Sequence, residues 1–171
     1  PDARPMAETT NASGGDFPKR THTCGALRLS DAGEEIVLNG WVESLRDHGG
    51  LRFLDLRDGL GITQVVLDPA KLAADAVESL RGEFVVAVRG AVRARPDGMR
   101  NPKLATGDVE VEAIALTILN AAEVPPFEIG VTDSEPGEEI RLRYRYLDLR
   151  RRTMQERIRA RARISRELRL Y

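Results

Sequence analysis

The chain has 171 residues, of which 42% are hydrophobic and 31% are charged, and its formal net charge is −1. That apolar content is sufficient for a packed core and excludes a wholly disordered chain, while the lack of any apolar run near ~20 residues excludes a membrane-spanning helix. A single cysteine, Cys24, excludes an intrachain disulfide and favours a reducing, cytoplasmic setting, with Cys24 as a small buried side chain.

The charge is distributed unevenly along the chain. Residues 141–171 hold twelve arginines, no lysine and three acidic residues, a formal charge of +9, which leaves −10 on residues 1–140. A split of this kind marks a nucleic-acid contact, an intersubunit surface, or a segment that packs on an acidic domain. Because the main body is acidic, it cannot bind RNA as a bulk polycation, so any nucleic-acid site there must be local and specific.

The chain begins with a leader, followed by a β-hairpin and a third strand. Residues 1–18 are rich in Ala, Thr, Gly and Asp and lack the apolar stretch of a secretory signal, so we expect a disordered leader. The β-rich run 36–46 and the alternating run 51–57 flank a turn that contains glycines 49–50, which predicts a hairpin. A second turn separates this hairpin from the β-rich run 62–67.

The rest of the body completes a five-stranded pattern. Pro69 opens a predicted helix at residues 70–80, and further strands are predicted at 84–95 and 108–119. Five strands with a helix between the third and the fourth are the arrangement of the OB-fold, a barrel whose exposed face commonly binds oligonucleotides. Order and spacing alone leave another five-stranded barrel open. We assign residues 19–120 to this all-β domain.

Beyond the barrel the sequence changes character. Residues 121–142 are rich in proline, glycine and acidic side chains, which predicts a linker or hinge. A C-terminal helical pattern then runs from Leu147 to Leu168, with apolar residues at three-to-four spacing opposite a face of arginines. Nothing of the right size in this chain is expected to cover that apolar stripe.

Several segments, taken together and in order, resemble bacterial-type aspartyl-tRNA synthetase. They are Gly40-Trp41-Val42, Arg46-Asp47-His48-Gly49-Gly50, Phe53-Leu54-Asp55-Leu56-Arg57-Asp58, Gly61-Ile62-Thr63-Gln64-Val65-Val66, Ala105-Thr106-Gly107 and Arg143-Tyr144-Arg145-Tyr146-Leu147-Asp148-Leu149-Arg150-Arg151. The resemblance covers residues 19–171. Each segment alone is weak evidence for the family, and the resemblance rests on their occurring together in this order. It implies an OB domain that binds the tRNA anticodon, within an enzyme that attaches aspartate to tRNA.

The resemblance also implies that residues 143–171 begin a class II catalytic domain. The family's Phe-Arg-x-Glu motif is missing here, since none of the four phenylalanines precedes an arginine, and no glycine follows Gly137. We therefore expect no catalytic residues, metal site or cofactor in these 171 residues, and binding of tRNA without aminoacylation. The full-length family members use ATP and Mg and form homodimers.

Four residues match the family's anticodon readers one by one: Arg46, Phe53, Gln64 and Glu110. Single-stranded RNA loops are read by stacking bases on aromatic rings and by hydrogen bonds to base edges. Phe53 is the stacking candidate, and Gln64 has the donor and the acceptor that a uracil edge requires. Arg46 offers a fork to a base edge or phosphate, and Glu110 can accept from a cytosine amino group.

Each of these residues has a structural alternative. Phe53 could be a core aromatic residue, and Gln64 and Glu110 could lie on a solvated strand face. Arg46 could be a surface ion. Two further expectations are purely structural: Trp41 belongs to the core, and Arg57 is either a surface ion or a brace for the neighbouring carboxylate of Asp55 or Asp58.

Other positions bear on specificity and on phosphate binding. His48 and Gly98 resemble relaxed members of the family, which charge both tRNA-Asp and tRNA-Asn, whose anticodons differ only in the third base, C against U. A simple turn residue is the alternative for His48. Arg89, Arg93 and Arg95 are predicted on one face of a strand, as possible phosphate contacts or as an exposed basic face.

Three other functions are compatible with this pattern. A general single-strand-binding OB module is one, although it would require more aromatic residues than 5% and a basic groove. The anticodon domain of an asparaginyl- or lysyl-tRNA synthetase is another, because those families share the architecture. The third is a stand-alone paralogue that kept the anticodon domain and lost catalysis.

Overall fold

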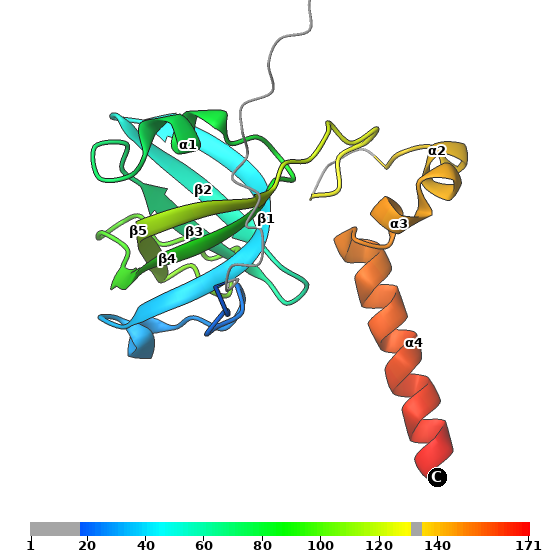
Figure 1. Ribbon diagram of the computed structural model, residues 1–171. Coiled ribbons are helices and arrows are strands. Elements are labelled where there is room, and N and C mark those ends of the chain that lie inside the picture. The colour runs from blue at the N-terminus through cyan, green and yellow to red at the C-terminus, as the bar shows by residue number, and fades with distance from the viewer. Residues whose placement is uncertain (1–17, 131–134) are drawn as a thin grey trace, which may run out of the picture. The chain divides into compact units, whose positions relative to one another are not determined.

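The computed structural model describes residues 18–130 and 135–171, so the leader predicted at residues 1–18 lies outside the described residues except for Pro18. The chain divides into two compact units, Pro1–Ala122 and Glu123–Tyr171. Figure 1 shows strands β1 to β5 and helix α1 in the first unit and helices α2 to α4 in the second. No helix within the described ranges is long and apolar enough to span a membrane.

Five strands close into a barrel in the first unit. Their bounds are β1 Glu35–His48, β2 Leu51–Arg57, β3 Ile62–Leu67, β4 Val85–Ala94 and β5 Val109–Asn120. The order around the barrel is β1-β2-β3-β5-β4, and β4 pairs back to β1. Strands β3 and β5 pair in parallel, whereas the other neighbours are antiparallel. The predicted five-stranded barrel with a helix after the third strand is confirmed.

Alternation along each strand fills the barrel core. Leu54 and Leu56 of β2 and Val86 and Val88 of β4 are fully buried, and Val92 of β4 is 2% exposed. Burial of each such side chain is worth roughly 1.5–3 kcal/mol relative to exposure. The two-residue period of a strand places the intervening residues on the outside, where the candidate site lies.

Close strand contact requires glycine at Gly90, beside an irregularity in the pairing of β4 with β5. A Cβ atom at this position would lie 2.4 Å from the carbonyl oxygen of Glu112. Any larger residue must therefore push β4 away from β5, which makes Gly90 a structural requirement of the barrel seam.

Helix α1 is shorter than the predicted helix at residues 70–80. It covers Ala74–Ser79, with Val77 buried against the core. The Asp68 carboxylate accepts a hydrogen bond from the Ala70 N–H at 2.9 Å. The backbone carbonyl of Asp68 accepts from the N–H groups of Lys71 and Leu72. Such a side-chain turn competes with helix formation, so the segment after Pro69 is a turn rather than a helix start.

The expectations for Trp41 and Arg57 were wrong. These residues are cross-strand partners on the outside of β1 and β2, so Trp41 is half-buried rather than part of the core. The guanidinium carbon of Arg57 lies 5.8 Å from the centre of the Trp41 ring. Arg57 forms ion pairs with Glu43 and, at 2.6 Å, with Glu83, and it does not brace Asp55 or Asp58 in the described structure.

The second unit is helical. Its elements are α2 Glu138–Arg143, α3 Arg145–Asp148 and α4 Arg152–Leu170. Helix α2 thus begins within the stretch 121–142 that was predicted to be a linker. Asp148 is fully buried and pairs with Arg145 and, at 3.2 Å, with Arg151, so the arginine-rich run forms a helical corner around one carboxylate.

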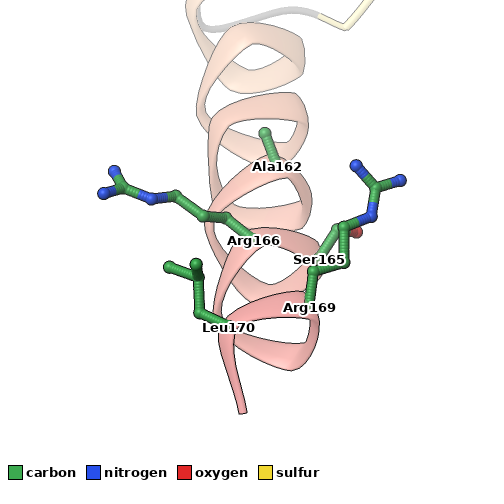
Figure 2. A pocket seen from close by; sticks show the side chains of 5 residues that line it. All are labelled: Ala162, Ser165, Arg166, Arg169 and Leu170. Carbon is green, nitrogen blue, oxygen red and sulfur yellow. The ribbon is translucent and has the colours of Figure 1, made fainter.

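Helix α4 presents no buried residue within this unit. Ile158 is 46% exposed and Leu168 is 75% exposed, in agreement with the expectation that the apolar stripe is uncovered among the described residues. Figure 2 shows the last turns of α4, where Arg166, Arg169 and Leu170 extend outward from a single helix around a shallow surface hollow. A hollow on one isolated helix offers no enclosed binding site.

Candidate nucleic-acid interface

The outer surface of the barrel carries a row of polar and aromatic side chains that crosses all five strands. Strand pairing aligns them, because Arg46 lies opposite Phe53, Asp55 opposite Gln64, and Arg93 opposite Glu110. A hydrogen bond from Gln64 to Glu110 joins β3 to β5 and completes the connection. We call this set the outer-face row: Arg46, Phe53, Asp55, Gln64, Glu110 and Arg93.

Phe53 lies on the outside of β2, beside the buried Leu54. It is half-buried and absent from the core cluster, whereas the next residue, Leu54, is fully buried. Its partners across the two adjacent strands are Arg46 and Val66. The core interpretation is therefore wrong for Phe53, and an aromatic side chain on this face suits base stacking.

Gln64 and Glu110 form the buried centre of the row. Gln64 Nε2 donates to Glu110 Oε2 at 2.9 Å, and the two residues are 9% and 3% exposed. The alternative of a solvated strand face is therefore wrong for both. Arg93 Nε donates to the other carboxylate oxygen, Glu110 Oε1, also at 2.9 Å.

An ion-pair chain continues from Arg93 to the segment after β3. Arg93 Nη1 donates to Glu112 Oε2 at 2.9 Å, and Lys71 Nζ lies 2.7 Å from Glu112 Oε1. The hydrogen bond from Lys71 lowers the pKa of Glu112, and the same contact raises the pKa of Lys71. The sequence did not predict the pairing of Lys71 with Glu112, because the two residues are 41 positions apart and Lys71 was expected in a helix.

The other side of the row holds a second carboxylate. Asp55 Oδ2 accepts from Ser44 Oγ at 2.7 Å and from Arg46 Nη2 at 2.9 Å. Asp55 Oδ1 and Arg95 Nη2 are buried side-chain atoms that have no hydrogen-bond partner in the described parts of the chain. Buried polar atoms are normally paired, so an open acceptor and an open donor at this face favour a polar ligand there.

The three arginines proposed as phosphate contacts differ in their surroundings. Arg89 pairs with Glu35 at 2.9 Å, and Arg93 is held by two glutamates. Arg95 donates from Nε to the carbonyl of Val109 at 3.0 Å, and burial lowers the pKa of its guanidinium. Of these three arginines, Arg95 is therefore the one with a buried donor, Nη2, that has no hydrogen-bond acceptor in the described structure.

His48 and Gly98 belong to two different parts of the barrel rim. His48 is the exposed last residue of β1, and Gly98 stands in the exposed β4–β5 loop with a φ of +77°, a conformation that favours glycine. In OB-folds the β1–β2 and β4–β5 loops border the oligonucleotide-binding face. His48 thus adjoins, and Gly98 lies in, a loop of the type that contacts bound bases.

Comparisons with known proteins agree with a nucleic-acid-binding face on the barrel. Residues 36–119 match the family model described as OB-fold nucleic acid binding domain. An Aspartate--tRNA(Asp/Asn) ligase from Rubrobacter xylanophilus is 55% identical over 156 residues, which are 90% of this chain and 26% of that protein. A crystal structure of asparaginyl-tRNA synthetase from Pyrococcus horikoshii matches 75% of this chain and 29% of its own, with a TM-score of 0.63 and 27% identity.

A more distant structure shows the fold alone. The aspartyl tRNA synthetase from Entamoeba histolytica has a TM-score of 0.70 over 91% of this chain and 37% of its own, at 20% identity. This chain spans about a quarter of the length of the curated relatives it matches.

Proposed function

We propose that the barrel reads the anticodon of tRNA, since residues 36–119 are a tRNA anticodon-binding OB-fold domain of the aspartyl-tRNA synthetase type. The outer-face row is the observation that supports this assignment best. It combines an aromatic side chain outside the core with a hydrogen-bonded Gln64–Glu110 pair and the open acceptor Asp55 Oδ1, and Arg95 adds an open donor. Stacking and base-edge hydrogen bonds are the interactions that recognise an RNA loop.

Four residues of the row have a proposed role in binding the anticodon. Phe53 stacks on a base, Gln64 reads the edge of uracil, and Arg46 contacts a base edge or phosphate. Glu110 accepts from a base amino group, using lone pairs that its two hydrogen bonds leave free. Among the arginines, Arg95 is the best-supported ligand contact because its Nη2 has no protein partner in the described structure.

The activity of a longer protein follows from this similarity as a proposal. Residues 19–120 would form the anticodon domain, 121–142 the hinge and 143–171 the start of a class II catalytic domain. The complete protein would attach aspartate to tRNA-Asp with ATP and Mg, as a homodimer in the cytoplasm.

Relaxed specificity is proposed on two grounds. His48 adjoins the β1–β2 loop and Gly98 lies in the β4–β5 loop, which both border the binding face, and the similar ligases carry Asp/Asn in their names. The complete protein would therefore also charge tRNA-Asn. Aminoacylation assays with both tRNAs test this, and undetectable charging of tRNA-Asn would reject the relaxed form.

The binding proposal is tested with anticodon stem-loop RNAs and this 171-residue chain. Fluorescence anisotropy would compare loops carrying GUC, GUU, AUU and UUU with an unrelated loop. We expect the GUC loop to bind at least about tenfold more tightly than the unrelated loop. Equal affinity for all loops would instead support a general single-strand-binding OB module, and a preference for UUU would support the lysyl type.

A further inference from the structure

We propose that Glu110 and Arg93 fix the orientation of the Gln64 side-chain amide, so that the site selects uracil over cytosine at the base read by Gln64. This inference rests on the proposed function, because it concerns how the same face distinguishes bases. It assigns to Glu110 an orienting role besides base contact, and it makes Arg93 a positioning residue rather than a phosphate contact.

The amide of Gln64 has two orientations of nearly equal shape and opposite hydrogen-bonding sense, because Oε1 accepts and Nε2 donates. In the structure Nε2 donates to Glu110 Oε2 at 2.9 Å. An ionised carboxylate only accepts, so the reversed amide would bring two acceptor oxygens together. At exposures of 9% and 3%, little water can relieve that repulsion. A single orientation follows.

Arg93 holds the carboxylate that orients the amide. Its Nε donates to Glu110 Oε1 and its Nη1 donates to Glu112 Oε2, both at 2.9 Å. Glu112 is in turn paired with Lys71 at 2.7 Å. Because Arg93 occupies Oε1, the Glu110 carboxylate presents Oε2 to Gln64 and is restrained from rotating away. The orientation of the Gln64 amide therefore depends on ion pairs between β4 and β5.

A fixed amide distinguishes the two pyrimidines. Uracil presents its N3–H donor beside the O4 acceptor, whereas cytosine presents an N3 acceptor beside an amino donor. With Nε2 directed to Glu110, Gln64 Oε1 can accept from uracil N3–H and the second Nε2 hydrogen can donate to O4. The same two contacts with cytosine require the reversed amide. The Gln64 amide alone could pair with either base. Its hydrogen bond to Glu110 makes it selective for uracil.

The test compares two stem-loops, GUC and GCC, that differ only in the middle base. For the wild-type chain we expect the GUC loop to bind on the order of tenfold more tightly. Glu110→Gln provides an amide that can donate as well as accept, so both orientations of Gln64 become possible and the ratio should fall to about twofold. Arg93→Gln should lower the ratio partly, and Arg93→Lys should restore most of it.

Arg89→Gln is the matched control for Arg93→Gln. It makes the same change of charge on the same strand, but Arg89 pairs with Glu35 and not with Glu110, so it should leave the ratio unchanged. The ratio of two affinities is informative because a general loss of RNA binding weakens both loops alike. Thermal unfolding of each variant establishes that it is folded.

The outcomes separate this inference from the function on which it rests. A wild-type chain that binds GUC no better than an unrelated loop refutes the proposed function. A wild-type chain that prefers GUC, with a ratio unchanged in Glu110→Gln, refutes the orientation mechanism. If Glu110→Gln does not fold, the Arg93 variants decide, because Arg93 is 43% exposed and its replacement leaves the core intact. A ratio equal to wild type in Arg93→Gln then refutes the mechanism.

Discussion

Replacing Phe53 with Ala removes the aromatic ring from the outer-face row and leaves the barrel core untouched. Phe53 is half-buried and does not belong to the core cluster. Full burial of a Phe side chain is worth roughly 1.5–3 kcal/mol, so the loss of a half-buried ring should lower the free energy of unfolding by about 1 kcal/mol. Stacking on a base contributes roughly 1–3 kcal/mol, which corresponds to a loss of affinity of about 5- to 150-fold.

Two companion variants separate stacking from stability. Phe53→Leu keeps an apolar side chain on the outer face and should recover stability while the affinity for the GUC stem-loop stays low. Leu54→Ala alters the next residue, which is fully buried, and should cost about 2–5 kcal/mol of stability. In conditions where that variant is folded, its affinity should stay close to wild type.

The assay is anisotropy of a labelled GUC stem-loop, with urea unfolding followed by circular dichroism. If Phe53→Ala bound the loop within about twofold of wild type, the proposed stacking role would be refuted, because the expected minimum loss is about fivefold. A loss of stability as large as that of Leu54→Ala would show instead that Phe53 supports the core.

Three further predictions concern specificity, reactivity and the barrel seam. His48→Leu should raise the preference for the GUC loop over the GUU loop from about threefold or less to about tenfold, measured by anisotropy, and an unchanged ratio would exclude His48 from third-base discrimination. Burial raises the pKa of the Cys24 thiol, so at about pH 8 it should stay protonated and resist iodoacetamide in the native chain, while reacting rapidly in denaturant. Mass spectrometry checks this, and fast native alkylation would contradict the burial. Gly90→Ala should destabilise the chain by about 1–3 kcal/mol in urea unfolding, because its Cβ would lie 2.4 Å from the Glu112 oxygen. Gly82→Ala, where a Cβ meets nothing within 4 Å, is the control and should change stability by less than about 0.5 kcal/mol.

The strands and their faces could be predicted because they depend on local alternation. Leu54 and Leu56 point inward and Phe53 and Asp55 outward simply because the period of a strand is two. Closure of the barrel then buries one set. The resemblance to a known family named Gln64 and Glu110 as site residues, and alternation alone would have left both as solvated positions.

The contacts that connect the site could not be predicted from local pattern. The pair Lys71–Glu112 links residues 41 positions apart, and Arg57 meets Glu83 26 positions away. These pairings exist because the barrel closes, which brings β4 and β5 against the earlier strands. The start of α1 also escaped prediction, since the Asp68 side chain forms a turn where periodicity favoured a helix.

The most direct test of anticodon binding by the outer-face row is amide chemical-shift mapping of the ¹⁵N-labelled 171-residue chain on addition of the GUC stem-loop. The account predicts that shifts concentrate on β2, β3, the start of β5 and the ends of β1 and β4, at Arg46, Phe53, Gln64 and Glu110 and at Arg95 just after β4. Side-chain amide signals of Gln64 should move with them. Shifts confined to the arginines of α4, or spread evenly over the surface, would contradict recognition by the outer face of the barrel.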